Sequence, residues 1–195
     1  KKLARANWKG SGDKFLEEKW FKVREKLNPT EFLGYEFNKL EGVILKISKG
    51  KDFVNEAKTG DEVEIITNQT PFYGESGGQV GDQGIIYSNN CKVIIKDTQK
   101  QMGDIHVHYG KIEKGSLKVN QTVNLEIDVQ RRNNARAYHS ATHLLHEALR
   151  RILGKHVTQK GSLVSSEKLR FDFSHNKIIE EKEIKKIEKH VNDMV

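Results

Sequence analysis

The stretch TVNLEIDV at residues 122–129 decides how this chain is interpreted. Every second residue from Val123 to Val129 is apolar and the residues between them are polar, which is the pattern of a strand with one buried face. After Asn133 the apolar residues recur every three or four positions, as on an amphipathic helix. The chain is therefore expected to change from β structure to helix close to residue 130.

Upstream of this stretch the same two-residue period recurs in several short segments. The candidate strands lie at residues 42–47, 62–66, 84–87, 92–96 and 105–109. Together with 122–129 they make six short strands joined by glycine-bearing connections, with no long helix between them. This pattern is typical of a small β-barrel or sandwich, which we expect to span residues 32–130.

The segments on either side of the β unit are predicted to be helical or mixed. Residues 13–27 have the spacing of an amphipathic helix that ends before Pro29. Downstream, a second helix should end near Gly154, residues 157–164 and 169–173 read as strands, and 180–194 as a third helix. The predicted fold class is α+β, with a helical arm at residues 1–31, a β-barrel at 32–130 and an α+β unit at 131–195.

Charge is unevenly distributed along the 195 residues, whose net charge is +7. The first 31 residues carry 9 basic and 5 acidic side chains, and residues 131–195 carry 14 and 8, whereas the middle is mildly acidic. A basic excess at both ends is compatible with a polyanionic partner, but lysine-rich helices with solvated faces give the same pattern. Charge by itself does not identify a nucleic-acid-binding protein.

Several classes of protein are disfavoured by the composition. No run approaches the ~18 apolar residues of a membrane-spanning helix, and the N-terminus has no apolar core of a signal peptide. Cys91 is the only cysteine, which excludes a disulfide or an all-cysteine zinc site within this chain. A cytoplasmic protein without a membrane partner is expected. Because the sequence starts without Met and stops within a helical pattern, we expect a piece of a longer protein.

The motif HSATH at residues 139–143 places His139 and His143 one helical turn apart, a spacing that can hold a zinc ion. His146 and Arg150 fall on the same side, roughly opposite the apolar stripe, so a solvated polar face is the alternative. No Glu follows the first histidine, which excludes the metalloprotease pattern. Tetrahedral zinc needs further ligands, and the remaining candidates, Cys91, His106 and His108, lie on predicted strands of the other unit.

A glycine-rich segment, TPFYGESGGQVGDQG at residues 70–84, is the second candidate motif. It lacks the Lys-Ser/Thr of a phosphate loop and is not part of a βαβ unit, so neither nucleotide fingerprint applies. Two interpretations are open: its glycines serve only a tight turn, or they bring backbone N–H groups, Glu75 and Gln79 close to a ligand. If both motifs serve one site, Gln79 should meet His139 and His143 between the two units.

Taken as complete strings, the two motifs change the interpretation. Residues 70–84 together with RAYHSATHLLHEALRRILGKHVTQKGSLVSSEKLRFDFSH at 136–175 resemble the editing domain of the alanyl-tRNA synthetase family. The segment WKGSGD at residues 8–13 is similar to the end of that family's helical tRNA-recognition region. Threonyl-tRNA synthetases share the paired histidines, but the SGGQ motif favours the alanyl family. Freestanding alanyl editing proteins share both motifs and remain an alternative.

The resemblance implies roles for individual residues. His139 and His143 match two zinc ligands, and the family's other two, in a Cys-x-x-x-His motif, lie downstream of this sequence. Gln79 and Thr142 are the implied catalytic residues. The implied substrate-binding residues are Gly77, Gly78, Gln159 and Ser162. ATP and Mg²⁺ belong to the family's aminoacylation domain, which this chain does not include.

The implied activity is the editing step of an alanine–tRNA ligase. A site built for a methyl side chain cannot strongly reject glycine or serine, and a second, hydrolytic site solves this problem. We therefore expect zinc-assisted deacylation of Ser-tRNA(Ala) and Gly-tRNA(Ala), with tRNA(Ala) and not DNA as the partner. The alternative is a module that only positions tRNA and has no competent active site in this chain.

Overall fold

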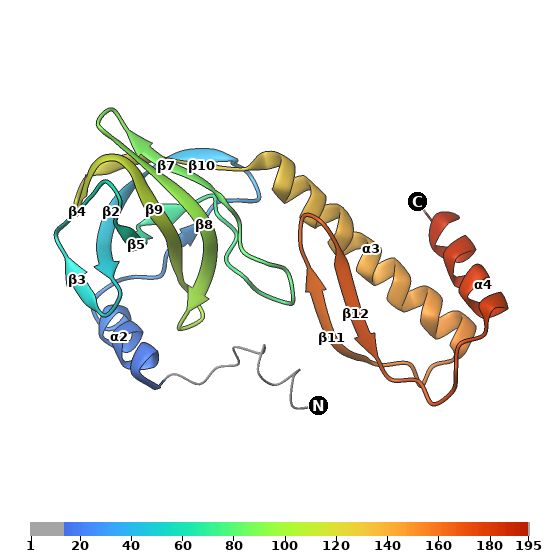
Figure 1. The fold of residues 1–195 in the computed structure, drawn as a ribbon. Coiled ribbons are helices and arrows are strands. Elements are labelled where there is room, and N and C mark those ends of the chain that lie inside the picture. Colours follow the sequence, from blue (N-terminus) through green and yellow to red (C-terminus); the bar gives the residue numbers. More distant parts are fainter. Residues whose placement is uncertain (1–13, 195) are drawn as a thin grey trace.

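A closed antiparallel barrel forms the first half of the computed structural model, which describes residues 14–194 (Figure 1). In spatial order its strands are β10 (Thr122–Ile127), β7 (Gly84–Ser88), β8 (Cys91–Gln101), β9 (Ile105–Lys118), β5 (Glu62–Thr67) and β2 (Lys39–Lys49). Strand β10 also pairs with β2, which closes the ring. The predicted small β-barrel is confirmed.

Alternating side chains from all six strands fill the barrel. On β10, Val123, Leu125 and Ile127 are at most 4% exposed, while the residues between them face outward. Ten further strand residues from the other five strands join this core: Ile44, Ile47, Val63, Ile65, Ile86, Cys91, Val93, Ile95, Ile112 and Leu117. Because so many β-branched side chains are buried on one face of each strand, the two-residue period could be recognised in the sequence.

Smaller elements surround the barrel. Strand β1 (Glu31–Phe32) pairs in parallel with β6 (Gln69–Thr70), and β3 (Asp52–Val54) and β4 (Glu56–Lys58) extend the sheet at β2 and β9. None of these two- or three-residue strands was predicted, because such short segments show no period. Helix α2 (Lys14–Arg24) lies across the lower end of the barrel in Figure 1.

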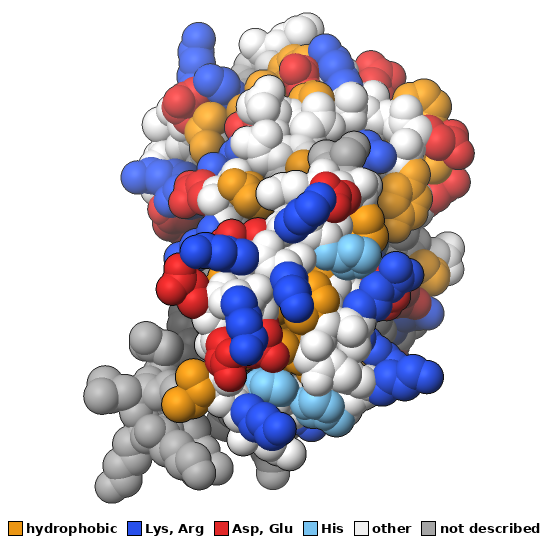
Figure 2. All heavy atoms as spheres, turned by 90° about the vertical axis from the view of Figure 1, so that its right-hand side faces the viewer, with side chains coloured by type: hydrophobic (Ala, Val, Ile, Leu, Met, Phe, Trp, Pro, Cys, Tyr) orange, Lys and Arg blue, Asp and Glu red, His pale blue; other side chains and the backbone are white. Residues whose placement is uncertain are grey.

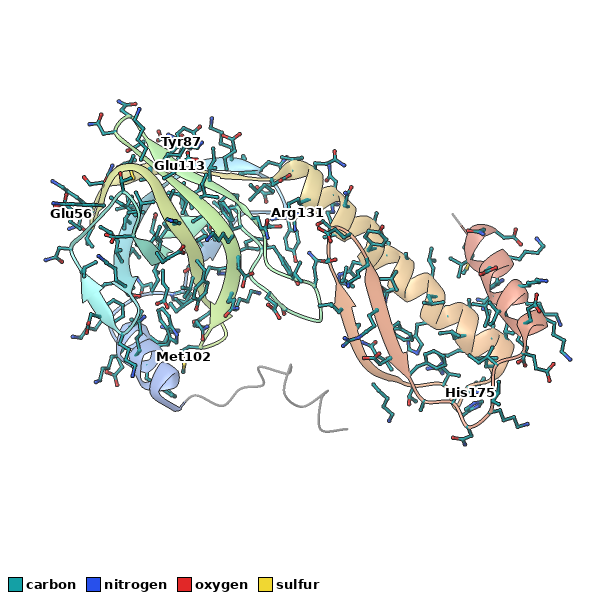
Figure 3. All side chains as sticks on the ribbon, in the orientation of Figure 1. Glu56, Tyr87, Met102, Glu113, Arg131 and His175 are labelled. Carbon is teal, nitrogen blue, oxygen red and sulfur yellow. The ribbon has the colours of Figure 1, made fainter. Side chains whose placement is uncertain are left out.

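Helix α2 is held by an apolar contact and an ion pair. Trp20 and Val23 pack on Ile66, Ile105 and Val107 of the barrel wall. Met102, in the turn between β8 and β9, contributes to the same contact and lies beside α2 in Figure 3. The Lys19 ammonium contacts the Glu64 carboxylate. The predicted helix is confirmed from residue 14 but ends at Arg24, before the predicted end at residue 27, and Glu31 already belongs to β1. Residues 1–13 of the predicted arm lie outside the described residues.

The transition from strand to helix occurs earlier than predicted. Strand β10 ends at Ile127, and helix α3 (Val129–Leu153) begins two residues later, so residues 128 and 129 are not part of the strand. The cause is a cap: the Asp128 side chain accepts a hydrogen bond from the Arg131 backbone N–H at 3.0 Å. The alternation that includes Val129 is therefore a coincidence, and this residue is 39% exposed. The domain boundary expected between 130 and 131 falls inside the first turn of α3.

The second half of the molecule is a layer of one hairpin and one helix on α3. Strands β11 (Gln159–Val164) and β12 (Leu169–Phe173) form the hairpin, and α4 (Glu181–Asn192) packs on the other side. The shared core consists of Ala148, Leu149, Val157 and Ile187. In Figure 3, Arg131 marks the end of α3 next to the barrel and His175 lies near the opposite end.

Two boundaries in this layer differ from the prediction. Val157 was expected to start a strand, but its N–H donates to the Gly154 carbonyl at 3.1 Å in the turn after α3. Its side chain is fully buried. The apolar residue at this position therefore belongs to the hydrophobic core without being part of a strand. Glu180 is the N-cap of α4 and not its first residue, because its side chain and that of Glu183 form a reciprocal capping box.

Two histidines are buried in the barrel wall as neutral groups. Burial lowers the pKa of His106 to about 3, assisted by the nearby charges of His108 and Lys100. Burial likewise lowers the pKa of His108 to about 4. His108 contacts the Thr70 hydroxyl at 2.7 Å and the Ile65 carbonyl at 3.0 Å, so it serves the barrel and is not available to a metal. His106 stacks on Phe32 with ring centroids 5.4 Å apart.

Stability should therefore fall in acid. Because the unfolded chain takes up protons near pH 6.5 and the folded chain only near pH 3–4, the free energy of unfolding should decrease as the pH drops from about 6.5 toward 4. Each histidine contributes a slope of at most about 1.4 kcal/mol per pH unit. Replacement of His106 by Phe should flatten the slope in urea-unfolding experiments between pH 4 and 7.5. The matched variant His156→Phe, at an exposed histidine, should leave the slope unchanged. Equal slopes in the two variants would contradict the prediction.

Candidate functional site

The glycine-rich segment leaves the barrel between β6 and β7 and reaches the β11–β12 hairpin. The Val164 N–H donates to the Gly78 carbonyl at 2.7 Å, and the Val80 N–H donates to the Val164 carbonyl at 3.0 Å. Gly78 has a φ of +84°, and a Cβ at this position would overlap the side chain and backbone of Ser162. Glycine is thus required here both for conformation and for close approach.

This approach brings the two motifs together. The Gln79 side chain is 5% exposed, and its Oε1 lies 2.8 Å from Nδ1 of His139 on α3. Because Oε1 can only accept, Nδ1 of His139 must donate, and a neutral imidazole then has its lone pair on Nε2. Gln79 therefore fixes the tautomer and the orientation of His139. The predicted meeting of Gln79 with His139, sixty positions apart, is confirmed, whereas His143 neither bonds to Gln79 nor lines the cavity in the described part of the chain.

His143 lies one helical turn after His139 and is exposed. The two rings have centroids 5.1 Å apart and are tilted by 31°. Within residues 14–194, no group of three or more His, Cys, Asp or Glu side chains has the geometry of a metal site. The donor set for a zinc ion thus consists of two imidazoles in the described part of the chain, and a complete site needs ligands from elsewhere.

A cavity of about 290 Å³ opens beside this contact, between the barrel and α3. It is lined by Gly34, Tyr35, Tyr73, Gln79, Arg132, Arg136, His139 and Ser140. No acidic residue lines it, so the cavity is suited to a polar or anionic ligand. Burial raises the pKa of Tyr73 above its usual value, and its hydroxyl donates to the Ser76 carbonyl at 3.2 Å.

Arg132 fixes the geometry of this cavity. Its guanidinium forms a buried ion pair with Asp82 at the end of the glycine-rich segment. It also donates to the Gly34 carbonyl at 2.7 Å and the Pro71 carbonyl at 2.8 Å. Arg132 precedes His139 by seven residues, which is two turns of the same helix face. The spacing was a usable signal, but sequence reasoning missed Arg132 and Tyr35, which lie outside both motifs. It also assigned no role to Tyr73 and Arg136, although they lie within the strings at 70–84 and 136–175.

The other predicted site residues do not line the cavity. The Thr142 side chain is buried and its hydroxyl donates to the Tyr138 carbonyl at 2.8 Å. Ser162 lies against Gly78, and Gln159 Nε2 donates to its hydroxyl at 3.3 Å. Gly77 has a φ of +59° and open space around it. The catalytic role of Thr142 and the substrate-binding roles of the others stay predictions.

The histidine side of α3 is not wholly solvated, which disagrees with the alternative of a solvated polar face at His146. His146 is partly buried against Phe171 of β12, with ring centroids 5.1 Å apart, and its Nε2 atom is shielded from solvent. The cause is the hairpin, which covers this side of the helix beyond His143 and could not be placed from the sequence. His139 and His143 lie nearer the barrel, where the cavity opens.

Charged side chains do not form one continuous basic surface at the α4 end of the molecule. Figure 2 shows Lys and Arg interspersed with Asp and Glu on this face. Ion pairs account for part of the pattern, including Lys185 with Glu181 at 2.7 Å and Arg151 with Glu147 at 2.6 Å. The basic excess of residues 131–195 is thus partly neutralised locally.

Comparison with known proteins identifies the family. A family profile described as tRNA synthetases class II (A) matches residues 1–131. The chain belongs to this family of tRNA synthetases. It is 51% identical over 98% of its length to the alanine–tRNA ligase of Chelativorans sp. (strain BNC1) and 50% identical to that of Rhodopseudomonas palustris. It is 51% identical over all 195 residues to the alanine–tRNA ligase of Nitrobacter winogradskyi.

The match to the alanine–tRNA ligases concerns a part of each relative. This tRNA synthetase chain spans 22% of the length of those curated proteins. The two motifs indicated homology to alanyl-tRNA synthetases, and this homology is confirmed. The chain and these relatives have the same residue at about half of the aligned positions. Among the helices of residues 14–194, none has the length and apolar character needed to cross a membrane.

Loss of Arg132 should destabilise this synthetase chain strongly. Replacement by Met leaves the Asp82 carboxylate buried without its cation, which costs about 3–5 kcal/mol in comparable pairs. Replacement of the neighbouring Arg131 by Met should cost about 0.5 kcal/mol or less, because its ion pair within residues 14–194 is a 4.0 Å contact to Glu167. Urea unfolding of both variants measures the difference. Equal decreases in the free energy of unfolding for the two variants would show that the buried ion pair contributes no more than an exposed arginine.

Proposed function

We propose that this chain is the editing module of an alanine–tRNA ligase and hydrolyses Ser-tRNA(Ala) and Gly-tRNA(Ala). The observation that carries the proposal is the hydrogen bond between Gln79 and His139 at the wall of the cavity. It joins the glycine-rich segment to the paired histidines in a chain about half identical to alanine–tRNA ligases. Neither motif alone would justify a deacylase.

In this proposal His139 and His143 hold a zinc ion. The donor chemistry fits, because the contact with Gln79 leaves the Nε2 lone pair of His139 free and His143 is exposed one turn away. The two remaining ligands come from outside this chain. The chemistry that a bound Zn²⁺ supplies is polarisation of an ester carbonyl or activation of a water molecule.

The residues of the chain orient the ester and the group it carries. Gln79 holds the His139 ring in one orientation, and the absence of carboxylates from the cavity lining avoids repulsion of the tRNA backbone. The resemblance assigns Gly77, Gly78, Gln159 and Ser162 to substrate binding. In support, Gly78 lies against Ser162 where the glycine-rich segment meets β11, and Gln159 donates to the Ser162 hydroxyl. Thr142 is retained as a proposed catalytic residue, which requires its hydroxyl to leave the Tyr138 carbonyl.

The selectivity follows from a physical limit of the synthetic site. A pocket for a methyl group discriminates weakly against one missing carbon or one extra hydroxyl, so errors with glycine and serine need separate removal. Aminoacylation itself, with ATP and Mg²⁺, is assigned to the part of the ligase outside this chain. The partner is tRNA(Ala) and the expected compartment is the cytoplasm.

One observation favours a second candidate function. Within residues 14–194 no third His, Cys, Asp or Glu side chain joins His139 and His143 in the geometry of a metal site. The chain would then position tRNA for a reaction completed elsewhere and have no hydrolytic activity without the rest of the ligase.

Deacylation of purified Ser-tRNA(Ala) by the complete ligase tests the proposal. His139→Ala should abolish deacylation and reduce the bound zinc, while Gln79→Ala, which frees the ring, should lower the rate about 10- to 100-fold. His156→Ala, an exposed histidine at the far end of α3, should change neither. The rate, the zinc content and the rate of charging with alanine are measured for each variant.

The outcomes separate the candidate functions. Full deacylation by the His139→Ala variant would exclude the proposed site. If the 195-residue chain alone binds tRNA(Ala) but deacylates nothing even with added Zn²⁺, the positioning role describes this chain.

A further inference from the structure

A bare tyrosine ring stands at the mouth of the cavity. Tyr35 is 85% exposed, yet it lines the cavity together with Gln79 and His139. Large aromatic side chains left this exposed at a concave site commonly mark a binding surface. The ring has no role in the hydrophobic core or in the proposed hydrolysis.

The position of Tyr35 is nevertheless well defined. Its ring packs edge-on against Phe32, with centroids 5.1 Å apart, and Phe32 in turn stacks on the buried His106. The preceding residue, Gly34, is anchored because its carbonyl accepts from Arg132 at 2.7 Å. A Cβ at Gly34 would overlap the Pro71 carbonyl, so the chain lies tightly against its neighbour here. The ring is presented from a fixed backbone.

A cation with no acidic partner lies across the same cavity. Arg136 follows Arg132 by one turn of α3 and is exposed. Arg132 is neutralised by Asp82, whereas no carboxylate among residues 14–194 lies within ion-pair distance of Arg136. The guanidinium is therefore available to a phosphate, which it can bind through two parallel hydrogen bonds.

An aromatic face beside an available guanidinium matches the chemistry of a single nucleotide. Unpaired bases stack on exposed aromatic rings, and their phosphates bind arginine. We propose that Tyr35 and Arg136 form the subsite for the 3′-terminal nucleotide of tRNA, with its base on the Tyr35 ring and its phosphate at Arg136. This rests on the proposed function, because the ester sits on the terminal ribose and the base must lie within one nucleotide of His139.

The subsite recognises a strand end and not a sequence. Stacking is tolerant of base identity, and the cavity lining supplies no acidic acceptor that would select an amino-bearing base edge. Discrimination between tRNAs is therefore left to surfaces outside the cavity, and the subsite acts on any end that reaches it.

Photo-crosslinking tests the subsite without requiring hydrolysis. The probe is an uncharged ribo-oligonucleotide ending in CCA whose last base is 8-azidoadenine, and the protein is the complete ligase. Tyr35 lies in the tryptic peptide 27–39, so its labelling is distinguished by mass spectrometry from that of any other strand-end site. The measured quantity is the probe concentration that gives half-maximal labelling of this peptide.

Matched variants separate stacking from nonspecific contact. Tyr35→Ala should raise the half-maximal concentration about 5- to 100-fold, the range for loss of one base stack, and Tyr35→Phe should stay within about 2-fold. Phe37→Ala removes an aromatic ring that is 47% exposed on the same peptide but does not line the cavity, and it should have no effect. Arg136→Gln should weaken labelling and lower its salt dependence by about one phosphate contact, whereas Arg150→Gln should not.

Failure of the proposed subsite can be distinguished from failure of the proposed deacylase, because labelling and deacylation are measured separately. Tyr35-dependent labelling in a ligase that fails to deacylate Ser-tRNA(Ala) would support the subsite and overturn the deacylase. Normal deacylation with the same KM and labelling in Tyr35→Ala would overturn the subsite and leave the deacylase standing. If the ligase has both the subsite and the deacylase activity, Tyr35→Ala should raise KM for Ser-tRNA(Ala) with little change in kcat. Circular dichroism checks that the variant is folded.

Discussion

The buried ion pair between Arg132 and Asp82 is the interaction on which the arrangement of this molecule depends. A guanidinium removed from water must have its hydrogen bonds satisfied, and here the Asp82 carboxylate and the carbonyls of Gly34 and Pro71 receive them. Such a pair adds little to stability compared with an apolar contact, but few alternative geometries satisfy it. It therefore selects one orientation of α3 against the barrel.

The site is a consequence of that orientation. Asp82 also accepts from the Tyr73 N–H at 2.7 Å, so the two ends of the glycine-rich segment are held together. The segment between them then projects to β11, where Gly78 pairs with Val164, and Gln79 meets His139. Because a helix is rigid over two turns, fixing Arg132 also fixes His139. The histidine is thus positioned from both of its sides.

The sequence revealed what depends on period and on local motifs. The barrel strands could be predicted because one face of each is buried. The contact between the glycine-rich segment and His139 was expected from the two motifs. The end of β10 was placed wrongly, because the cap formed by Asp128 outweighs an alternation that continues to Val129. Arg132 and Tyr35 belong to no motif. Arg132 is important through Asp82, which is fifty positions away, and Tyr35 lines the cavity together with Gln79 and His139, which are also distant in sequence. Contacts of this kind leave no local pattern.

A single residue, Asp128, separates the strand that closes the barrel from the long helix that carries the histidines. Strand β10 is paired on both edges, and Asp128 is occupied in capping α3. A single capped residue leaves little freedom for a hinge at this junction, and we therefore expect the barrel and the helix to move together. Entry to the cavity is then governed by the side chains at its rim and by the path of the incoming strand, without an opening and closing of the two halves.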